Sequence, residues 1–193
     1  MPKGIFFLVA GPAGVGKTTL LKRLVAEESD LLKAVSVTTR LPREGEVDGR
    51  EYFFWNELKF QEAIQRGEFL EFAIVHGKAF YGTLAKFVLE KLDQGYDVVK
   101  DIDVQGVEQI VKLPAFKGRV ATIFVMPPSQ DELFARLRGR KSESDQTFES
   151  RVQSAKNEMA KAKDYDYVLV NDDLDRAVNE LKMIRKAAHD KMK

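Results

Sequence analysis

The stretch GIFFLVAGPAGVGKTTLLKRLVAEE, residues 4–28, decides the fold of this chain. An apolar run suited to a buried strand comes first, a glycine-rich loop follows, and Leu20, Leu21 and Leu24 then recur at helical spacing. The loop matches the pattern G-x-x-x-x-G-K-[ST] in the strand-to-helix context that this pattern requires. The stretch therefore predicts a phosphate-binding loop at the edge of an α/β sheet.

This loop contains three kinds of phosphate-binding group. Its glycines permit backbone conformations that turn successive N–H groups inward, and the following helix adds the positive end of its dipole. Lys17 adds a full charge that should reach the β- and γ-phosphates, and Thr18 offers a hydroxyl to Mg²⁺. A nucleoside triphosphate with Mg²⁺ is the ligand that these groups favour.

Apolar runs and helical periodicity alternate along the rest of the chain. Residues 5–10, 98–101, 120–125 and 167–170 suit buried strands, with amphipathic segments between them. The predicted fold class is therefore α/β, a parallel sheet with helices on both faces. The segment 35–81 differs because the strand-like pieces YFFW and FLEFAIV flank one short helix, so we interpret it as an inserted lobe.

Composition excludes several classes of function. The 193 residues carry 31 basic and 30 acidic side chains, and the net charge of +1 gives no general attraction to nucleic acid or an anionic membrane. The chain has no cysteine and two histidines, which excludes disulfides, thiolate catalysis and a Cys/His zinc site. The N-terminal apolar run is too short for a membrane span and lacks a signal-peptide cleavage region, so we expect a cytoplasmic protein.

A phosphate loop alone does not separate a GTPase, an ATPase motor and a small-molecule kinase. DVQG, residues 103–106, fits the D-x-x-G of GTPases, but no N-K-x-D occurs, and the chain is short for a motor. A kinase needs a second anion site, and SVTTRLPREGEVDGREYFF, residues 36–54, offers the guanidinium forks of Arg40 and Arg43 and the hydroxyl of Tyr52. A solvated basic loop is the alternative interpretation of that segment.

Two carboxylates lie at the end of the strand predicted at residues 98–101. In DVVKDID, Asp101 and Asp103 stand at alternate positions and point to one side of the sheet at its C-terminal edge, where ligands of open α/β sheets bind. Two acids simply solvated beyond the strand end are the alternative.

Six segments, GPAGVGKTT, SVTTRLPREGEVDGREY, FLEFAIVHGKAFYGT, DIDVQG, RLRGRKSES and NDDLDRA, resemble the guanylate kinase family in order and spacing. The resemblance extends from residue 11 to about residue 181. It implies a single domain with a P-loop core (residues 1–34, 84–128 and 161–193), a GMP-binding lobe of mixed β/α structure (about 35–83) and a helical lid (about 129–160). It also implies the reaction of ATP with GMP, or dGMP, to give ADP and GDP, or dGDP, with Mg²⁺.

The resemblance assigns the acceptor site residue by residue. The phosphate of GMP would be held by Arg40, Arg43, Tyr52 and Tyr81, and its base by Glu71, Ser36, Thr83 and Asp103, while Asp101 would contact GMP or magnesium-bound water. Glu71 has a clear physical role, because an ionised carboxylate accepts from both N1–H and the N2 amine of guanine but repels the N1 lone pair of adenine. The segment between Glu71 and Tyr81 is one residue longer than the common family form.

The donor site and the lid are assigned in the same way. ATP would be bound by Gly11, Pro12, Ala13, Gly14, Val15, Gly16, Lys17, Thr18, Thr19, Arg136, Arg140 and Asn171, and the catalytic residues would be Lys17, Arg140 and Arg151. Arginines on a closing lid would neutralise the charge that spreads over the transferring phosphoryl group. Asp172 or Asp173 would cap the C-terminal helix.

Two other functions are compatible with such a fold. One is a catalytically inactive guanylate kinase-like module that binds a protein, against which the intact Lys17, Thr18 and lid arginines argue. The other is a P-loop kinase for a different acceptor, which leaves Ser36 and Glu71 unexplained. The expected partners are small nucleotides, with no nucleic acid or membrane, and both a monomer and a homodimer remain open.

Overall fold

The computed structural model describes residues 4–75, 79–139 and 148–191. In chain order its elements are β1 (Phe6–Ala10), α1 (Lys17–Glu27), β2 (Leu31–Lys33), β3 (Ser36–Thr38), β4 (Tyr52–Phe54), α2 (Glu57–Gln65), β5 (Phe69–Val75), β6 (Ala79–Leu84), α3 (Ala85–Asp93), β7 (Asp97–Asp101), α4 (Val104–Ile110), β8 (Val120–Met126), α5 (Gln130–Gly139), α6 (Phe148–Ala160), β9 (Tyr167–Val170) and α7 (Leu174–Lys191). Short 3₁₀ turns occur at Pro114–Phe116 and Ala162–Asp164.

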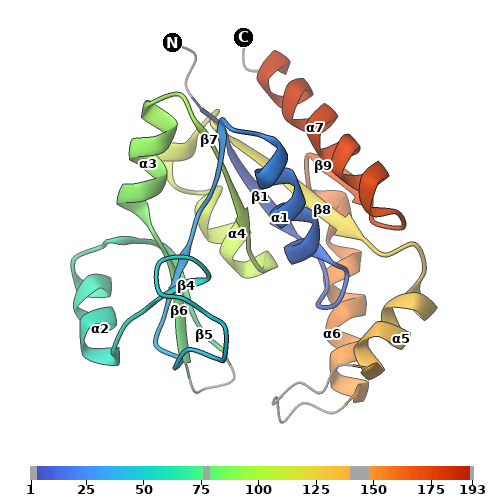
Figure 1. The fold of residues 1–193 in the computed structure, drawn as a ribbon, viewed down its shortest axis with the longest axis horizontal. Coiled ribbons are helices and arrows are strands. Elements are labelled where there is room, and N and C mark those ends of the chain that lie inside the picture. The colour runs from blue at the N-terminus through green and yellow to red at the C-terminus, as the bar shows by residue number, and fades with distance from the viewer. Residues whose placement is uncertain (1–3, 76–78, 140–147, 192–193) are drawn as a thin grey trace.

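A parallel sheet with strand order β2-β7-β1-β8-β9 forms the centre of the molecule (Figure 1). β1 lies between β7 and β8 and pairs in parallel with both, so the chain leaves the middle of the sheet when it enters the glycine-rich loop. That position is where loops after parallel strands gather ligands. The predicted α/β fold is confirmed.

Alternate residues of β1 face opposite sides of the sheet and are buried on both. Phe7 and Val9 pack with apolar side chains of α1 and α7, whereas Phe6 and Leu8 pack with those of α3 and α4. Because helices cover both faces, the strand is a continuous apolar run rather than an alternating one. This is the physical basis of the pattern at residues 5–10.

A second, mixed sheet with strand order β4-β3-β6-β5 lies beside the core (Figure 1). β3 pairs in parallel with β4 and antiparallel with β6, and β6 pairs antiparallel with β5. The ring of Phe60 from α2 stacks on Phe69 of β5 at 4.4 Å between centroids. On the other side Leu70 joins the apolar cluster of the core, which fixes this sheet against α4.

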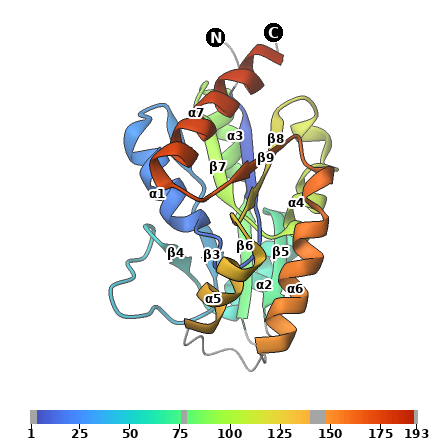
Figure 2. The same cartoon turned by 90° about the vertical axis from the view of Figure 1, so that its right-hand side faces the viewer.

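Helices α5 and α6 project from the same end of the core as the second sheet and lie opposite it (Figures 1 and 2). The Ser129 hydroxyl accepts from the backbone N–H of Glu132 at 3.2 Å and so caps the start of α5. Leu133, Leu137 and Ala155 are buried in the cluster formed with α1 and α7. These helices are therefore anchored at their core-facing sides.

The edge strand β2 is a feature that the sequence pattern missed. It has three residues, of which only Leu31 is fully buried, and it pairs in parallel with β7. A run this short gives too little periodicity to distinguish a strand from a loop. Within the ranges that the structure describes, no helix is both long and apolar enough to cross a membrane.

Candidate active site

A cleft of about 590 Å³ lies between the phosphate loop and the second sheet. Both sheets and α6 contribute to its wall. The lining residues are Gly11, Ala13, Lys17, Thr18, Lys33, Ala34, Ser36, Glu46, Glu51, Tyr52, Glu71, Ala73, Tyr81, Gly82, Lys100, Asp101, Ile102, Asp103 and Glu158. The structure thus brings residues predicted for the donor and for the acceptor into one continuous space.

The backbone of the phosphate loop depends on its glycines. Gly11, Gly14 and Gly16 have φ angles of 146°, 85° and 98°, a region that residues with a side chain rarely adopt. A Cβ atom on Gly11 would lie 2.4 Å from the carbonyl oxygen of Val125. The loop therefore packs directly against the end of β8, and the first glycine is needed for this approach as well as for its φ angle.

Lys17 is the first residue of α1 and faces the loop that precedes it. Its ammonium donates hydrogen bonds to the carbonyl oxygens of Gly11 at 2.6 Å and Pro12 at 3.2 Å. These bonds hold the positive charge of Lys17 beside the loop, close to the N-terminal N–H groups of α1.

Thr18 and Asp101 lie next to each other although they come from different elements. The Thr18 hydroxyl donates to Oδ2 of Asp101 at 3.3 Å. Asp101 is the last residue of β7, the strand beside β1, so the parallel register brings its side chain to the loop. A hydroxyl and a carboxylate are hard oxygen ligands of the type that Mg²⁺ prefers.

Asn171 supports the loop from behind. Its side-chain amide donates to the carbonyl oxygen of Val15 at 2.8 Å, and its backbone N–H donates to Met126 O at 2.9 Å. The amide therefore ties the loop to the end of β8. Asp173, two residues later, caps α7 by accepting from the N–H of Arg176 at 2.8 Å.

Arg40 is held in place by an acidic partner and two aromatic rings. Its two terminal nitrogens donate to the two oxygens of Glu46 at 2.8 and 2.9 Å, and its Nε donates to the Tyr81 hydroxyl at 3.2 Å. The guanidinium also lies over the Tyr52 ring at 5.3 Å. The hydrogen bonds from Arg40 and from the N–H of Arg43 lower the pKa of Glu46 to about 2, so this pair is ionised at neutral pH.

Tyr81 lies beside two other residues that were predicted to bind the acceptor phosphate, Arg40 and Tyr52. Its ring lies 5.8 Å from that of Tyr52 in an edge-to-face arrangement. Burial raises the pKa of Tyr52, so its hydroxyl remains protonated and able to donate.

Glu71 lies deep in the cleft, where the two sheets meet. The Thr83 hydroxyl, on the neighbouring strand β6, donates to Oε1 of Glu71 at 2.5 Å and orients the carboxylate. Burial raises the pKa of Glu71, and the charge of Lys100 opposes that shift. A Cβ on Gly106 would lie 3.4 Å from the other carboxylate oxygen, so α4 packs closely behind it.

Lys100 is a cleft residue that the sequence interpretation did not select. It lies in β7, its exposure is 3%, and its ammonium donates to the Ser36 hydroxyl. Burial lowers its pKa to about 8, against the opposing charges of Glu71 and Asp101. The available signal was a lysine within residues 98–101, a segment predicted to be a buried strand, since lysine is almost never fully buried without partners.

The remaining predicted residues lie at the edges of the cleft or elsewhere. Asp103 caps α4, accepting from the N–H of Gly106 at 2.7 Å, and this accounts for the D-x-x-G pattern. Arg151 is half-buried on α6, whereas Arg136 is exposed on α5, 3.4 Å from Glu132. Arg140 lies outside the described residues. From α6, Glu158 reaches the cleft wall.

Comparison with known proteins gives a consistent result. The family model described as guanylate kinase matches residues 5–188. A guanylate kinase of Cereibacter sphaeroides is 45% identical over 185 residues, covering 96% of this chain and 87% of that protein. One from Wolbachia of Brugia malayi is 40% identical over 182 residues, covering 94% and 92%.

A solved structure shares the three-dimensional arrangement. The crystal structure of guanylate kinase from Anaplasma phagocytophilum has a TM-score of 0.78 at 30% identity, covering 97% of this chain and 87% of that one. With the family model matched over nearly the whole length and the two-sheet fold shared, the chain belongs to the guanylate kinase family.

Proposed function

We propose that this protein transfers the γ-phosphoryl group of ATP to GMP, giving ADP and GDP, and that dGMP is a second acceptor. The observation that carries the proposal is the single cleft in which the phosphate loop and Glu71 face the same space. Family membership supports the same reaction. We further propose that it acts in the cytoplasm.

The acceptor side has the chemistry that GMP requires. Arg40, Tyr52 and Tyr81 form one cluster of donors at the cleft, suited to a phosphate dianion. Glu71, already oriented by Thr83, can accept from N1–H and the N2 amine of guanine. The base and the phosphate of GMP would thus be bound by different strands of the second sheet.

Catalysis would consist mainly of positioning and charge neutralisation. The acceptor is already a phosphate oxygen anion, so the transfer needs no covalent intermediate and no strong base. Lys17 and the loop N–H groups would hold the β- and γ-phosphates. We propose that residues 129–160 act as a lid, bringing Arg140 and Arg151 to the transferring group and excluding water.

The residues beside the loop fit Mg²⁺. Thr18 would bind the ion directly and Asp101 would bind it through water, because their oxygens face each other across 3.3 Å. The bound ion would neutralise charge on the ATP phosphates. Lys17 and Thr18 are adjacent in sequence at the start of α1, so ion and ammonium would lie on neighbouring sides of the phosphates.

Thr18→Val tests this ion site. Valine has a similar shape but no hydroxyl, so the Mg²⁺ concentration for half-maximal rate is expected to rise about 10-fold or more. The rate would be titrated against Mg²⁺ at saturating ATP and GMP. Lys22→Met, at an exposed position of the same helix that does not line the cleft, is the control. An unchanged requirement in Thr18→Val would contradict the assignment.

Glu71→Gln tests the reaction and the base contact together. ADP production would be measured with GMP, dGMP, AMP, IMP, CMP and UMP. The wild-type protein is expected to use GMP and dGMP well. In the variant kcat/KM for GMP should fall about 100-fold, because the amide cannot accept from both guanine donors and presents an N–H group to them.

Glu62→Gln is the matched control. Glu62 is exposed on α2 and pairs with Arg66 at 3.5 Å, so its substitution should leave kcat/KM unchanged within about twofold. A folded wild-type protein that binds GMP but phosphorylates none of the acceptors would reject the kinase function and favour a binding module.

A further inference from the structure

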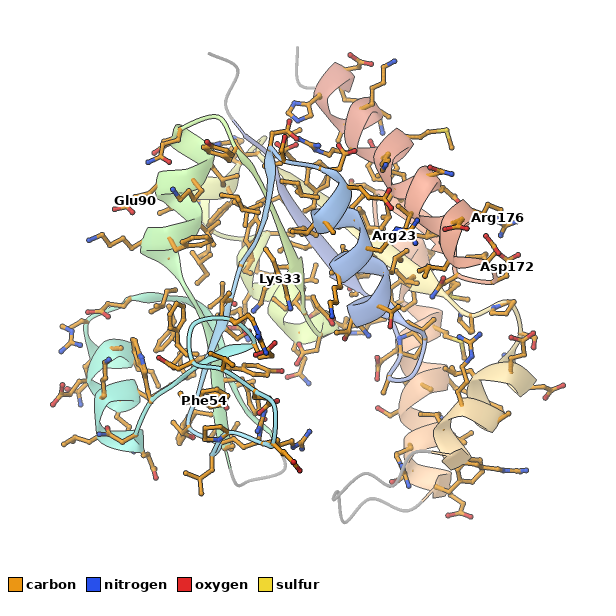
Figure 3. The ribbon with its side chains drawn as sticks, viewed as in Figure 1. Arg23, Lys33, Phe54, Glu90, Asp172 and Arg176 are labelled. Carbon is orange, nitrogen blue, oxygen red and sulfur yellow. The ribbon has the colours of Figure 1, made fainter. Side chains whose placement is uncertain are left out.

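Lys100 occupies a position with an unusual electrostatic environment. Its ammonium is buried and hydrogen-bonded to Ser36, and it is attracted by the charges of Glu71 on β5 and Asp101 on β7, while the like charge of Lys33 on β2 opposes them. Lys33 also lines the cleft, and Figure 3 shows it at the front of the core near the second sheet. A buried charge is costly unless it is paired and hydrogen-bonded. The burial of this charge therefore indicates that Lys100 has a role other than packing.

The hydrogen bond to Ser36 has a defined direction. An ammonium group has three donors and no acceptor, so the Lys100–Ser36 bond uses a lone pair of the Ser36 oxygen. The single hydrogen of Ser36 is then left for another acceptor. Ser36 begins β3 and lines the cleft together with Glu71, so the hydroxyl can present this hydrogen to a ligand.

We infer that Lys100 is a specificity-determining positioning residue, whose ammonium holds the Ser36 hydroxyl as a hydrogen-bond donor toward the 6-oxo group of the guanine. The inference rests on the proposed function. Glu71 then reads the donors N1–H and N2 amine, and Ser36 reads the adjacent acceptor. Adjacent groups on one edge of the base are thus matched by an acceptor and a donor that are both fixed in place.

The consequence concerns discrimination at position 6. A 6-amino group presents hydrogens to a hydroxyl whose own hydrogen already points outward, and this mismatch leaves buried polar groups unpaired. Without the ammonium the Ser36 hydroxyl is free to rotate and to accept instead. Loss of Lys100 should therefore weaken the preference for a strong acceptor at position 6 rather than recognition of the whole base.

The experiment compares GMP with 6-thioguanosine 5′-monophosphate and with IMP. The thio analogue keeps N1–H and the N2 amine but replaces the 6-oxo oxygen with a poor acceptor, whereas IMP lacks only the N2 amine. In the wild-type protein kcat/KM for GMP should exceed that for the thio analogue about 10-fold or more, the discrimination expected of a hydrogen bond to a group polarised by a charge.

In Lys100→Met the ratio of kcat/KM for GMP to that for the thio analogue should fall below about threefold. KM for GMP should rise about 10-fold while kcat changes less than about threefold, because the lost contact stabilises the bound substrate and the transition state equally. The GMP-to-IMP ratio, which reports on Glu71, should stay at the wild-type value. A merely structural role for Lys100 would lower kcat/KM for GMP and the thio analogue equally. That result would overturn the inference.

Ser36→Ala keeps the test decisive if Lys100→Met does not fold. It should abolish the same oxo-to-thio preference, and adding Lys100→Met should reduce the preference no further, because the two residues act through one hydroxyl. A Ser36→Ala protein with the wild-type preference would overturn the inference while leaving the kinase reaction intact. Absence of turnover with GMP in the wild-type protein would reject both.

Discussion

Replacing Lys17 by methionine is expected to lower kcat about 10³-fold or more, which corresponds to about 4 kcal/mol of transition-state stabilisation. Its ammonium lies over the phosphate loop, bonded to the carbonyl oxygens of Gly11 and Pro12. Negative charge develops on the phosphoryl oxygens during transfer, and the other two lysines named in the cleft lining, Lys33 and Lys100, lie on β2 and β7 rather than at the loop. Methionine keeps the length of the side chain and removes only the charge and the donors.

The measurement is steady-state ADP production at saturating ATP and GMP, with GMP affinity determined by calorimetry. Lys22→Met is the matched control, because Lys22 is exposed on the same helix and does not line the cleft. GMP affinity should be unchanged in Lys17→Met, since the acceptor contacts lie on the other wall. A kcat within about 10-fold of the wild-type value would mean that Lys17 does not stabilise the transferring phosphoryl group.

Arg185→Met is expected to lower the free energy of unfolding by about 3 to 5 kcal/mol. Asp97 begins β7 and is 1% exposed. Its carboxylate accepts from Arg185 Nε at 2.5 Å, the N–H of Ile5 at 2.8 Å and the His189 ring. Arg185, itself 12% exposed, also pairs with Glu28 and Asp30 at 2.6 Å. Removing it leaves a buried carboxylate without its main counter-charge.

Urea unfolding would measure this loss, and Arg176→Met is the matched control. Arg176 lies on the same helix but pairs with Asp172 at 2.6 Å with both side chains exposed, as Figure 3 shows at the start of α7. Its loss should cost less than about 0.5 kcal/mol. Adding Asp97→Asn to Arg185→Met should recover part of the stability by removing the buried charge. No recovery would assign the loss to packing instead.

The substitutions at Lys17 and Arg185 distinguish a residue that acts in the reaction from a residue that stabilises the fold. Lys17 lies at the loop end of the core, and the Asp97–Arg185–His189 cluster ties α7 to the starts of β7 and β1, at the other ends of these strands. Lys17→Met should therefore lose activity and keep its stability, whereas Arg185→Met should lose stability and keep the kcat of its folded fraction.

Where contacts are local in sequence, the pattern predicted the structure well. β1, the glycine-rich loop and α1 follow one another within 22 residues, and their periodicity and glycine spacing state the backbone conformation directly. The capping of α7 by Asp173 was visible for the same reason, because a cap and its helix lie within one turn of each other.

The roles that we propose for Glu71, Tyr81 and Asp101 came from the ordered resemblance rather than from local pattern. A single glutamate in FLEF is compatible with an exposed strand residue, and periodicity cannot say which face meets a ligand. The antiparallel register of β5 and β6 decides that Thr83 lies beside Glu71. The parallel register of β1 and β7 brings Asp101 to Thr18.

The sequence by itself determined the buried strands of the core, the phosphate loop and its lysine, since each is indicated by a pattern of residues close together in the chain. Only the tertiary structure decided that Lys100 lies against Ser36, 64 positions away, and that Arg185 neutralises Asp97 across 88. Both lysine and arginine are ordinarily solvated, and their burial becomes favourable only after strands distant in sequence have brought oxygen partners to them. No local pattern carries that information.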